Sequence, residues 1–480
     1  MSFSRDSSTS RAASKLFPGT LKPEARSTVN LERADDDEEH DDVFGDQGKG
    51  AINYRSVGWV GTAVILLKSQ LGTGILSIPS TFRVLGIIPG LICMLVIAAM
   101  TTWTGLVSGR FKLRHPEVYS INDAGTLMFG AAGGEIAGAL TWLYQALSVG
   151  SGLLAFSTAF NAVTVHGTCT TVFTLVCTLL TILFASFRTL ENVRWIGWVG
   201  LVSIVSAILT ITIAVGVNSR PAAAPQEGPL NLEIVLFGTP SFAEAMNAVG
   251  NLVFAFMGAS LYLPIASEMA DPRQFTEAVI LCQSLLTSIY VAIGVVVYYF
   301  AGQYVTSPAL GTAGPLIKRI AYGLAMPSLL ASCVIWGHLA AKYIFVRSLR
   351  GTRHLNHSTA THWIVWLGSV IGTMVFAFIV ASAIPVFGGL VGLVGSLFGT
   401  LFSLQAQAWM WGFDHWTKIR SGDWLRSRAM WLTVPFNAFV FIAGMYIMGA
   451  GTYGAAIQIR DDYAANGGVP FSCADTSGSV

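Results

Sequence analysis

The chain has 480 residues, of which 53% are hydrophobic and only 11% are charged, and its formal net charge is +2. Soluble domains carry roughly 25% charged residues, so this composition indicates a protein surrounded by membrane lipid. The near-neutral charge argues against nucleic acid as a partner. No His-Glu-x-x-His, P-loop or Gly-x-Ser-x-Gly motif and no Cys/His metal spacing occurs, so the sequence predicts no enzyme, no metal site and no cofactor.

The first 56 residues differ in composition from the rest of the chain. They are rich in Ser, Arg and Asp, contain an acidic run at 35–42, and lack the apolar core of a signal peptide. We expect a disordered cytoplasmic tail over residues 1–56. A transmembrane domain over 57–455 and an extracellular or luminal C-terminal tail over 456–480 are expected to follow.

Apolar segments of near-spanning length recur from residue 57 onward. A membrane helix needs about 20 mostly apolar residues, and about eleven segments meet this requirement. They lie near 58–82, 87–109, 139–164, 170–187, 195–217, 242–266, 278–301, 316–345, 362–384, 386–410 and 430–451. The sequence therefore predicts an all-α integral membrane protein with about eleven transmembrane helices.

Lysine and arginine cluster in the loops that follow the second, fourth, eighth and tenth segments. These loops all fall on one side, which the positive-inside rule assigns to the cytoplasm. We therefore expect a cytoplasmic N-terminus and a C-terminus on the opposite face. Cys169 and Cys473 are then the only cysteines expected in an oxidising compartment, and we predict that they can pair.

Two of the segments contain helix-breaking residues. Gly72 and Gly74 precede Pro79 in the first segment, and Gly258 precedes Pro264 in the sixth. Such breaks free backbone N–H and C=O groups inside the membrane, where a polar substrate or ion can satisfy them. Because the two broken segments lie five positions apart in the order of segments, which is an odd number, the two units enter the membrane from opposite faces. This spacing predicts a five-plus-five inverted repeat with broken first and sixth helices, with the eleventh as an appendage.

The residues around the breaks form the predicted binding site. The N–H groups freed near Gly72, Thr73, Gly74 and Ile75 suit a carboxylate, because a helix N-terminus carries partial positive charge. Carbonyls freed from Phe254 to Gly258 suit an amine, and Phe254, Phe256 and Met257 would border a side-chain pocket. No acidic residue lies near either break, which favours a neutral ligand. For each aromatic residue alone, packing within the bundle is the alternative.

Other polar residues within the apolar segments are further candidates. Tyr144 and Ser148 share one face of the third segment with Ser151, either to contact the ligand or to bond a neighbouring helix. Lys68 lies one turn before Gly72, where a charge is costly unless it faces the bundle interior. The sixth segment carries a polar stripe of Glu244, Asn247 and Asn251 near its outer end, where Glu244 is expected mainly to stabilise the helix N-terminus. Glu268, near the inner end, is either a coupling residue or a solvated helix-end acid.

Four stretches of the sequence resemble the amino acid/auxin permease family, in particular its fungal neutral amino acid permeases. They are KSQLGTGILSIPSTFRVLGIIPG (68–90), HGTCTTVF (166–173), RTLENVRWIGWVGLVSIVSA (188–207) and FAFMGASLYLPIASEMADPRQF (254–275). The resemblance covers about residues 55–455 and implies the fold of the bacterial leucine transporter, with proton-driven amino acid uptake. Many relatives have Glu-Gly-His after Phe-Ala-Phe, whereas Met257-Gly258-Ala259 stands here, so a titratable group of the family is missing.

These features together predict a secondary active transporter of small neutral amino acids that alternates access around the two breaks. Protons are the expected coupling ion, with Lys68 and Glu268 as candidate groups. Sodium is the rival, held by carbonyls of the first break and hydroxyls of Ser328 and Ser332. An amino acid sensor that signals through the N-terminal tail is an alternative of another class. We expect the plasma membrane rather than the vacuolar membrane.

Overall fold

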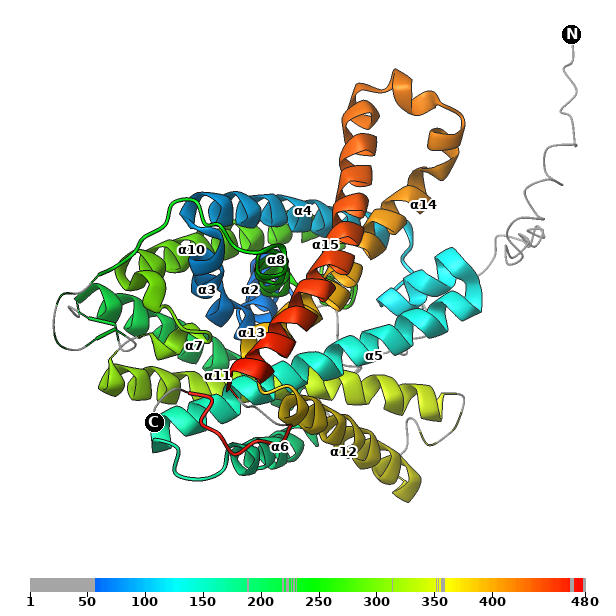
Figure 1. Cartoon of the computed structure of the whole chain (residues 1–480). Coiled ribbons are helices and arrows are strands. Elements are labelled where there is room, and N and C mark those ends of the chain that lie inside the picture. The colour runs from blue at the N-terminus through cyan, green and yellow to red at the C-terminus, as the bar shows by residue number, and fades with distance from the viewer. Residues whose placement is uncertain are drawn as a thin grey trace, which may run out of the picture.

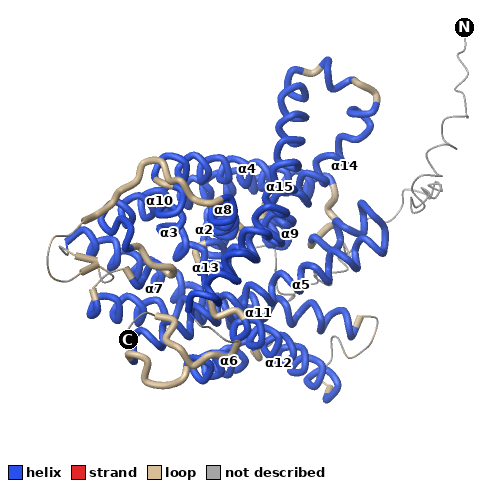
Figure 2. Tube along the Cα trace, viewed as in Figure 1, coloured by secondary structure: helices blue, strands red, loops and turns tan. Residues whose placement is uncertain are grey.

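The computed structural model describes residues 57–477, apart from gaps at 188–189, 218–219, 222–223, 226, 228, 230, 313, 351, 353, 355–358 and 467–469. The tail expected over residues 1–56 lies outside the described residues. Within the described part of the chain the elements are helices, and the one extended pairing is an isolated bridge between Val57 and Met269 (Figure 2).

The longer helices are α2 (Trp59–Gln70), α3 (Ile78–Leu85), α4 (Ile87–Arg114), α5 (Ile121–Thr164), α6 (Thr170–Ala185), α7 (Leu190–Val217), α8 (Phe242–Phe256), α9 (Tyr262–Ser267), α10 (Phe275–Ala301), α11 (Pro315–Leu349), α12 (Ala360–Ala383), α13 (Phe387–Val394), α14 (Ala406–Arg420) and α15 (Arg428–Asn466). Short 3-10 helices are η1 (Thr73–Ser77), η2 (Ala259–Leu261), η3 (Pro272–Gln274), η4 (Gly302–Tyr304), η5 (Ala309–Gly311) and η8 (Asp423–Arg426), and π-helical turns are η6 (Gly395–Gly399) and η7 (Leu401–Gln405).

The predicted membrane spans are present as helices. Among the described residues, nine helices are long and apolar enough to cross a bilayer, and one of them, Phe242–Ser267, contains the second predicted break. The pair Trp59–Gln70 and Thr73–Leu85 forms a further span bent by 47°, and the apolar helix Thr170–Ala185 is slightly shorter than the rest. The prediction of an all-α membrane protein with broken first and sixth helices is confirmed, and among the described residues the expected count of about eleven spans is reached when the bent pair and this shorter helix are included.

Two boundaries differ from those expected. Helix α5 begins at Ile121 rather than near 139, because Ser120 and Asp123 form a capping box that starts it, and it changes direction at Gly130, where φ is 73°. Helix α15 continues to Asn466, so the tail expected from residue 456 begins later. Residues 455–466 contain no glycine or proline to end the helix, and the next glycines are at 467–468.

The two broken spans lie together at the centre of the bundle. Helices α2, α3 and α8 occupy the middle of the molecule, while the α14–α15 hairpin projects from one side (Figure 1). Helix α3 packs against α8, and α2 contacts α9, so the first half of each broken span lies beside the second half of the other. This antiparallel crossing is the arrangement that an inverted repeat predicts.

Small residues allow the helices around this crossing to approach closely. A Cβ atom on Gly74 would lie 2.6 Å from Cα of Ala255, and one on Gly395 would lie 2.2 Å from the Gly250 carbonyl oxygen. Helix association in membranes depends on such close packing, because apolar burial supplies little driving force in lipid. The central helices are therefore fixed by backbone contact.

Candidate functional site

The first break follows from the local sequence. Helix α2 ends at Gln70, Leu71 leaves the helical region with ψ at 80°, and Gly72 adopts φ −136° and ψ −134° before η1 begins at Thr73. The first N–H groups of a helix have no partner inside it, so the N-terminal turn of η1 presents donors at the break. Pro79 occupies the first turn of α3, where its missing N–H costs no helical hydrogen bond.

The second break has the same form. Helix α8 ends at Phe256, Met257 is extended (φ −78°, ψ 114°), and Gly258 (φ −152°, ψ −7°) leads into η2 and then α9. A Cβ atom on Gly258 would lie 2.6 Å from Cγ of Gln70. The turn of the second break therefore packs directly on the last residue of α2.

A buried tyrosine joins the two breaks. The Tyr290 hydroxyl of α10 lies 3.1 Å from the Gln70 carbonyl oxygen and 2.9 Å from the Ala255 carbonyl oxygen, and its ring packs edge-on against Phe256. Both carbonyls belong to helix ends that lack the usual partner four residues later, and the Gln70 carbonyl also accepts a hydrogen bond from the Gly72 N–H at 2.8 Å. One hydroxyl therefore satisfies acceptors from both broken spans, a role that no sequence pattern indicated.

A small cavity of about 20 Å³ lies between the breaks. That volume holds about one water molecule, so this conformation is closed around the site. None of the described residues that line the cavity carries a charge, and several offer hydroxyl or amide groups. The lining residues are Ser69, Gln70, Gly72, Thr73, Gly74, Ser148, Gly152, Phe254, Met257, Ser332 and Trp336.

The cavity brings together many of the residues predicted from sequence. Gly72, Thr73, Gly74, Ser148, Phe254, Met257 and Ser332 line it, whereas the other predicted binding residues lie around it. Ile75 is buried in the core, Phe256 packs on Tyr290, and Gly258 packs on Gln70. Tyr144 is fully buried behind the cavity, with its ring 5.6 Å from that of Trp336.

Sequence reasoning missed four lining residues, Ser69, Gln70, Gly152 and Trp336. Helical spacing was the available signal for two of them. Trp336 lies four residues after Ser332, and Gly152 lies four residues after Ser148, so each shares a face with a predicted residue. Gln70 is the last helical residue before the break.

The coupling candidates occupy different places. The ammonium of Lys68 lies against Gly197 of α7, since a Cβ atom built there would overlap it. Ser332 lines the cavity, with its hydroxyl 3.3 Å from the Cβ position of Gly72, whereas Ser328 packs beside Gly200 of α7. The two serines lie one turn apart on α11, and only Ser332 is among the residues that line the cavity.

Glu268 ends α9 at the far side of the second break and is exposed. Desolvation by the protein around it raises the pKa of its carboxyl, and Lys342 opposes this shift. Its carbonyl accepts a hydrogen bond from the Val57 N–H at 3.4 Å, and the Ala270 N–H donates to the Val57 carbonyl at 3.0 Å. The chain just before α2 is thus paired with the end of the sixth span.

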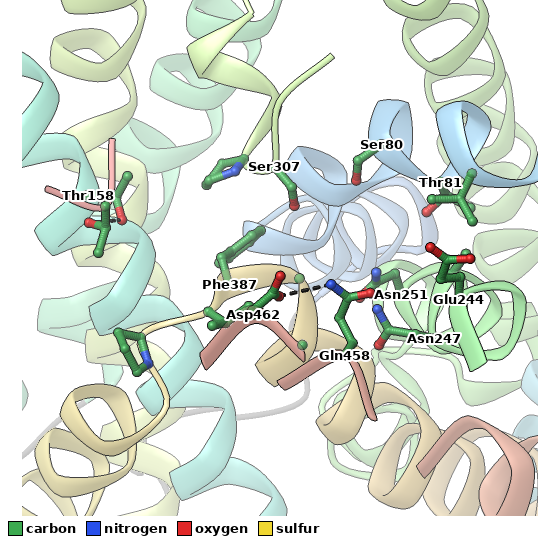
Figure 3. Close-up of a pocket in the computed structure, with 18 of the residues that line it drawn as sticks. Ser80, Thr81, Thr158, Glu244, Asn247, Asn251, Ser307, Phe387, Gln458 and Asp462 are labelled. Atoms are coloured by element: carbon green, nitrogen blue, oxygen red, sulfur yellow. Dashed lines mark hydrogen bonds between the residues drawn. The ribbon is translucent and has the colours of Figure 1, made fainter. Parts of the chain in front are cut away.

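A larger cavity of about 580 Å³, here called the vestibule, lies at the other end of the broken spans (Figure 3). Helix α3 contributes Ser80 and Thr81, and helix α8 contributes Asn247 and Asn251. The two asparagines are buried, and neither amide oxygen has a hydrogen-bond partner among the described residues. Asn251 lies one turn of α8 from Phe254, so the vestibule floor approaches the small cavity.

Glu244, also at the vestibule, has a structural role in this conformation. Its carboxylate accepts hydrogen bonds from the N–H and hydroxyl of Ser241, both at 2.8 Å, which completes a capping box at the start of α8. The expectation that Glu244 stabilises the helix N-terminus is confirmed. Among the described residues, no group of three or more His, Cys, Asp or Glu side chains is placed to hold a metal ion.

The bundle, its two adjoining breaks and the uncharged cavity define a multi-pass membrane protein with a central polar site. Residues 55–457 match the family described as "Transmembrane amino acid transporter protein". The chain belongs to this family, as its sequence resemblance predicted, and is a transporter rather than an enzyme.

Curated relatives from fungi cover almost the whole chain. A "Transmembrane transporter" of Gibberella moniliformis is 35% identical over 442 residues, which is 92% of each chain. An "N amino acid transport system protein" of Neurospora crassa is 33% identical over 436 residues, covering 89% of this chain and 90% of the relative.

Solved structures resemble the chain at low sequence identity. A Na⁺-coupled sialic acid symporter in an outward-open state aligns with a TM-score of 0.48 and 16% identity, over 84% of this chain and 90% of its own. The inward-facing conformation of Mhp1 aligns with a TM-score of 0.47 and 15% identity, over 89% of this chain and 95% of its own.

Proposed function

We propose that this transporter carries small neutral amino acids through the cavity between its two broken helices. The observation that carries the proposal is the lining of that cavity, which combines backbone groups of both breaks with hydroxyl and amide side chains and contains no charged side chain. A zwitterionic amino acid has no net charge, so its site needs hydrogen-bond donors for the carboxylate and acceptors for the ammonium group rather than a charged side chain. The first break supplies N–H donors, and the second break supplies carbonyl acceptors.

The substrate carboxylate is assigned to the first turn of η1, where the N–H groups of Thr73 and Gly74 lack intrahelical partners, because the i→i+3 bonds of a 3-10 helix begin at the Ile75 N–H. The ammonium group is assigned to carbonyls at the end of α8, supported by the hydroxyl of Ser148 or Ser332. Phe254, Met257 and Trp336 border the substrate side chain. Because the closed cavity holds only about one water molecule, binding requires the walls to separate.

Transport then follows from motion at the crossing of the two spans. The vestibule at one end and the Val57–Met269 pairing at the other describe a conformation open toward the vestibule side and closed at the opposite end. Closure of the vestibule and release of that pairing would expose the site to the other face, which is alternating access around a fixed midpoint. The inverted repeat makes such an exchange of roles between the two halves possible.

We propose protons as the coupling ion and Glu268 and Lys68 as the groups that exchange them. Support comes from the raised pKa of Glu268 and from the position of Lys68 one turn before the break. A sodium ion at Ser332 is the rival, because that hydroxyl lies beside Gly72 at the cavity. Ser328, one turn earlier on α11, would supply the second hydroxyl of such a site.

We further propose a plasma-membrane location with the N-terminus in the cytoplasm. The disulfide between Cys169 and Cys473 supports an oxidising compartment on the vestibule side, since such bonds persist outside the cytosol. The described basic residues at the ends of α4, α11 and α14 lie at the other ends of the helices.

The deciding experiment is uptake of a labelled neutral amino acid into proteoliposomes under separate proton and sodium gradients. We expect accumulation under an inward proton gradient without sodium, abolished by a protonophore and competed by other neutral amino acids but not by lysine or glutamate. Binding without accumulation under any gradient would contradict the transport proposal and favour a sensor. Accumulation that requires sodium and ignores protonophores would contradict proton coupling alone.

A further inference from the structure

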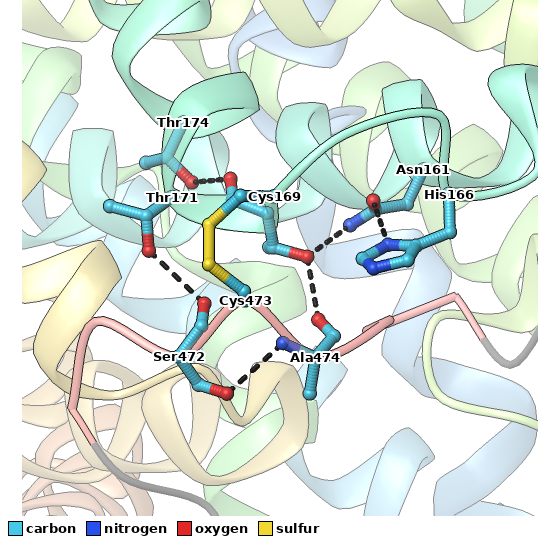
Figure 4. Close-up of a disulfide and its surroundings, with 9 residues drawn as sticks. Asn161, His166, Cys169, Thr171, Thr174, Ser472, Cys473 and Ala474 are labelled. Carbon is cyan, nitrogen blue, oxygen red and sulfur yellow. Dashed lines mark hydrogen bonds between the residues drawn. A yellow bond between two sulfur atoms is a disulfide. The ribbon is translucent and has the colours of Figure 1, made fainter.

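Residues 470–477, here called the C-terminal strap, cross the vestibule side of the molecule after α15 ends. Cys473 forms the predicted disulfide with Cys169, the residue just before α6 (Figure 4). Thr171 donates a hydrogen bond to the Ser472 carbonyl at 3.1 Å, and Thr170 donates to the Ala474 carbonyl at 2.6 Å. The disulfide is therefore flanked by hydrogen bonds on both sides.

Further bonds extend the attachment to three other helices. Asn161 of α5 donates to the Thr476 hydroxyl at 3.2 Å, and Lys318 of α11 donates to the Ser477 carbonyl. The Phe471 N–H donates to the Ser382 carbonyl in α12 at 2.8 Å. The strap is thus fixed to the group α5, α6, α11 and α12.

Helix α15, from which the strap emerges, packs mainly on other helices, and its Tyr463 hydroxyl donates one hydrogen bond to the Ala383 carbonyl at the end of α12. It packs along α8, the outer half of the sixth span, and against α13. Seven peptide units join Asn466 at its end to Cys473, which limits their separation to about 25 Å. The disulfide-bonded strap therefore adds a short covalent connection between the helices around the sixth span and the group α5, α6, α11 and α12.

The strap also forms part of the vestibule wall. Ser472, Ala474, Asp475 and Thr476 line the cavity together with Gln458 and Asp462 of α15, while α3 and α8 contribute Ser80, Thr81, Asn247 and Asn251. The strap joins α15 to α6, and both the strap and α15 line the vestibule. The width of the vestibule therefore depends on how far apart these walls lie. Any change in that width alters the path that the strap must span.

We propose that the C-terminal strap is a disulfide-closed tether that sets how far the outer vestibule opens. The role of this tether in transport rests on the proposed alternating access, whereas the experiment that tests the tether does not require transport. With the Cys169–Cys473 bond intact, the strap stays on the wall and restrains the separation of α8 from α5 and α6. With the bond cut, only hydrogen bonds hold the strap, and it can leave the wall.

The test measures the accessibility of the vestibule rather than transport. Ser80→Cys places a reporter thiol on the α3 wall, and its reaction with a membrane-impermeant maleimide is followed by mass spectrometry of that peptide. We expect the reaction rate to rise severalfold when the disulfide is cut by an impermeant phosphine. The phosphine attacks one sulfur and breaks the S–S bond, and hydrolysis by one water molecule then gives two thiols and the phosphine oxide, so that the phosphine supplies the two electrons and water supplies the oxygen and both protons.

Genetic removal of the bond supplies the second arm. Cys169→Ser, Cys473→Ser and the double variant should each show the same raised rate at the reporter, and the phosphine should have no further effect on them. Glu233→Cys, at an exposed loop position outside the vestibule lining, is the control whose rate should not change. If the variants fail to reach the membrane, reduction of the already folded protein still decides.

If the rate of maleimide reaction at the reporter is unchanged or lower after reduction of the disulfide, the tether proposal is overturned. Because the assay needs no substrate, a chain that failed to accumulate amino acids would still give either result. Failure of the tether and failure of the proposed transport function are therefore distinguishable.

Discussion

Tyr290→Phe removes one oxygen atom from the junction of the two broken spans and leaves the aromatic ring in place. The Ala255 carbonyl, 2.9 Å from the hydroxyl, then loses this donor, whereas the Gln70 carbonyl, 3.1 Å from the hydroxyl, keeps its hydrogen bond from the Gly72 N–H at 2.8 Å. A buried polar group without its partner costs about 1–3 kcal/mol. The ring contact with Phe256 remains, so loss of packing adds little.

A penalty of that size changes a conformational equilibrium about 5- to 150-fold. We expect Tyr290→Phe to lower the thermal stability of the detergent-solubilised transporter and to reduce the maximal uptake rate in proteoliposomes, because the closed arrangement of the breaks is destabilised. The measurement pairs a thermal unfolding scan with initial uptake rates, normalised to the reconstituted protein.

Tyr298→Phe is the matched control, since Tyr298 is another buried tyrosine of α10. Its hydroxyl accepts from the Val235 N–H at 3.1 Å, in a loop away from the breaks. We expect this variant to keep its uptake rate. If Tyr290→Phe matched the wild type in both stability and uptake, the shared carbonyls would not depend on the hydroxyl, and the reasoning would be refuted.

Other substitutions test the cavity and the coupling. Gly74→Leu should abolish uptake, because its Cβ would lie 2.6 Å from Ala255, whereas Gly372→Leu, at an open position on α12, should transport normally; uptake by the first variant would show that the spans need not touch. Ser332→Ala should raise the KM about 2- to 12-fold through one lost hydrogen bond, measured by concentration-dependent uptake, with Ser328→Ala as the comparison. Because the pKa of Glu268 is raised, its carboxyl exchanges a proton nearer neutral pH than that of an ordinary glutamate. Glu268→Gln should therefore lose proton-driven accumulation but retain substrate exchange. Proton-driven accumulation in that variant would show that this carboxyl is not the coupling group.

The breaks could be predicted from sequence because glycine and proline act locally. Gly72 and Gly258 interrupt apolar runs, and each observed break includes the predicted glycine. The disulfide followed from loop charge, which placed Cys169 and Cys473 on one face. The capping box of Glu244 is likewise a short-range pattern.

Which residues line the cavity depends on how each helix is rotated about its axis and on contacts between residues far apart in the sequence. A single stretch of sequence contains neither kind of information. Phe254 and Phe256 were both assigned to the pocket, but residues two apart on a helix point in nearly opposite directions, and only Phe254 lines the cavity. Tyr290 lies in an ordinary apolar run, and its role depends on carbonyls that are 220 and 35 residues away. The extension of α15 was missed because its last turns are polar rather than apolar.

The pairing of Val57 with the end of the sixth span gives the N-terminal segment a mechanical position. Val57 is the first described residue, and its N–H and carbonyl bond to Glu268 and Ala270 at the end opposite the vestibule. In the proposed alternating access, opening of that end requires α9 either to carry Val57 with it or to release both bonds. Helix α2, which begins two residues later, is therefore attached at a point whose position changes with the direction in which the transporter faces.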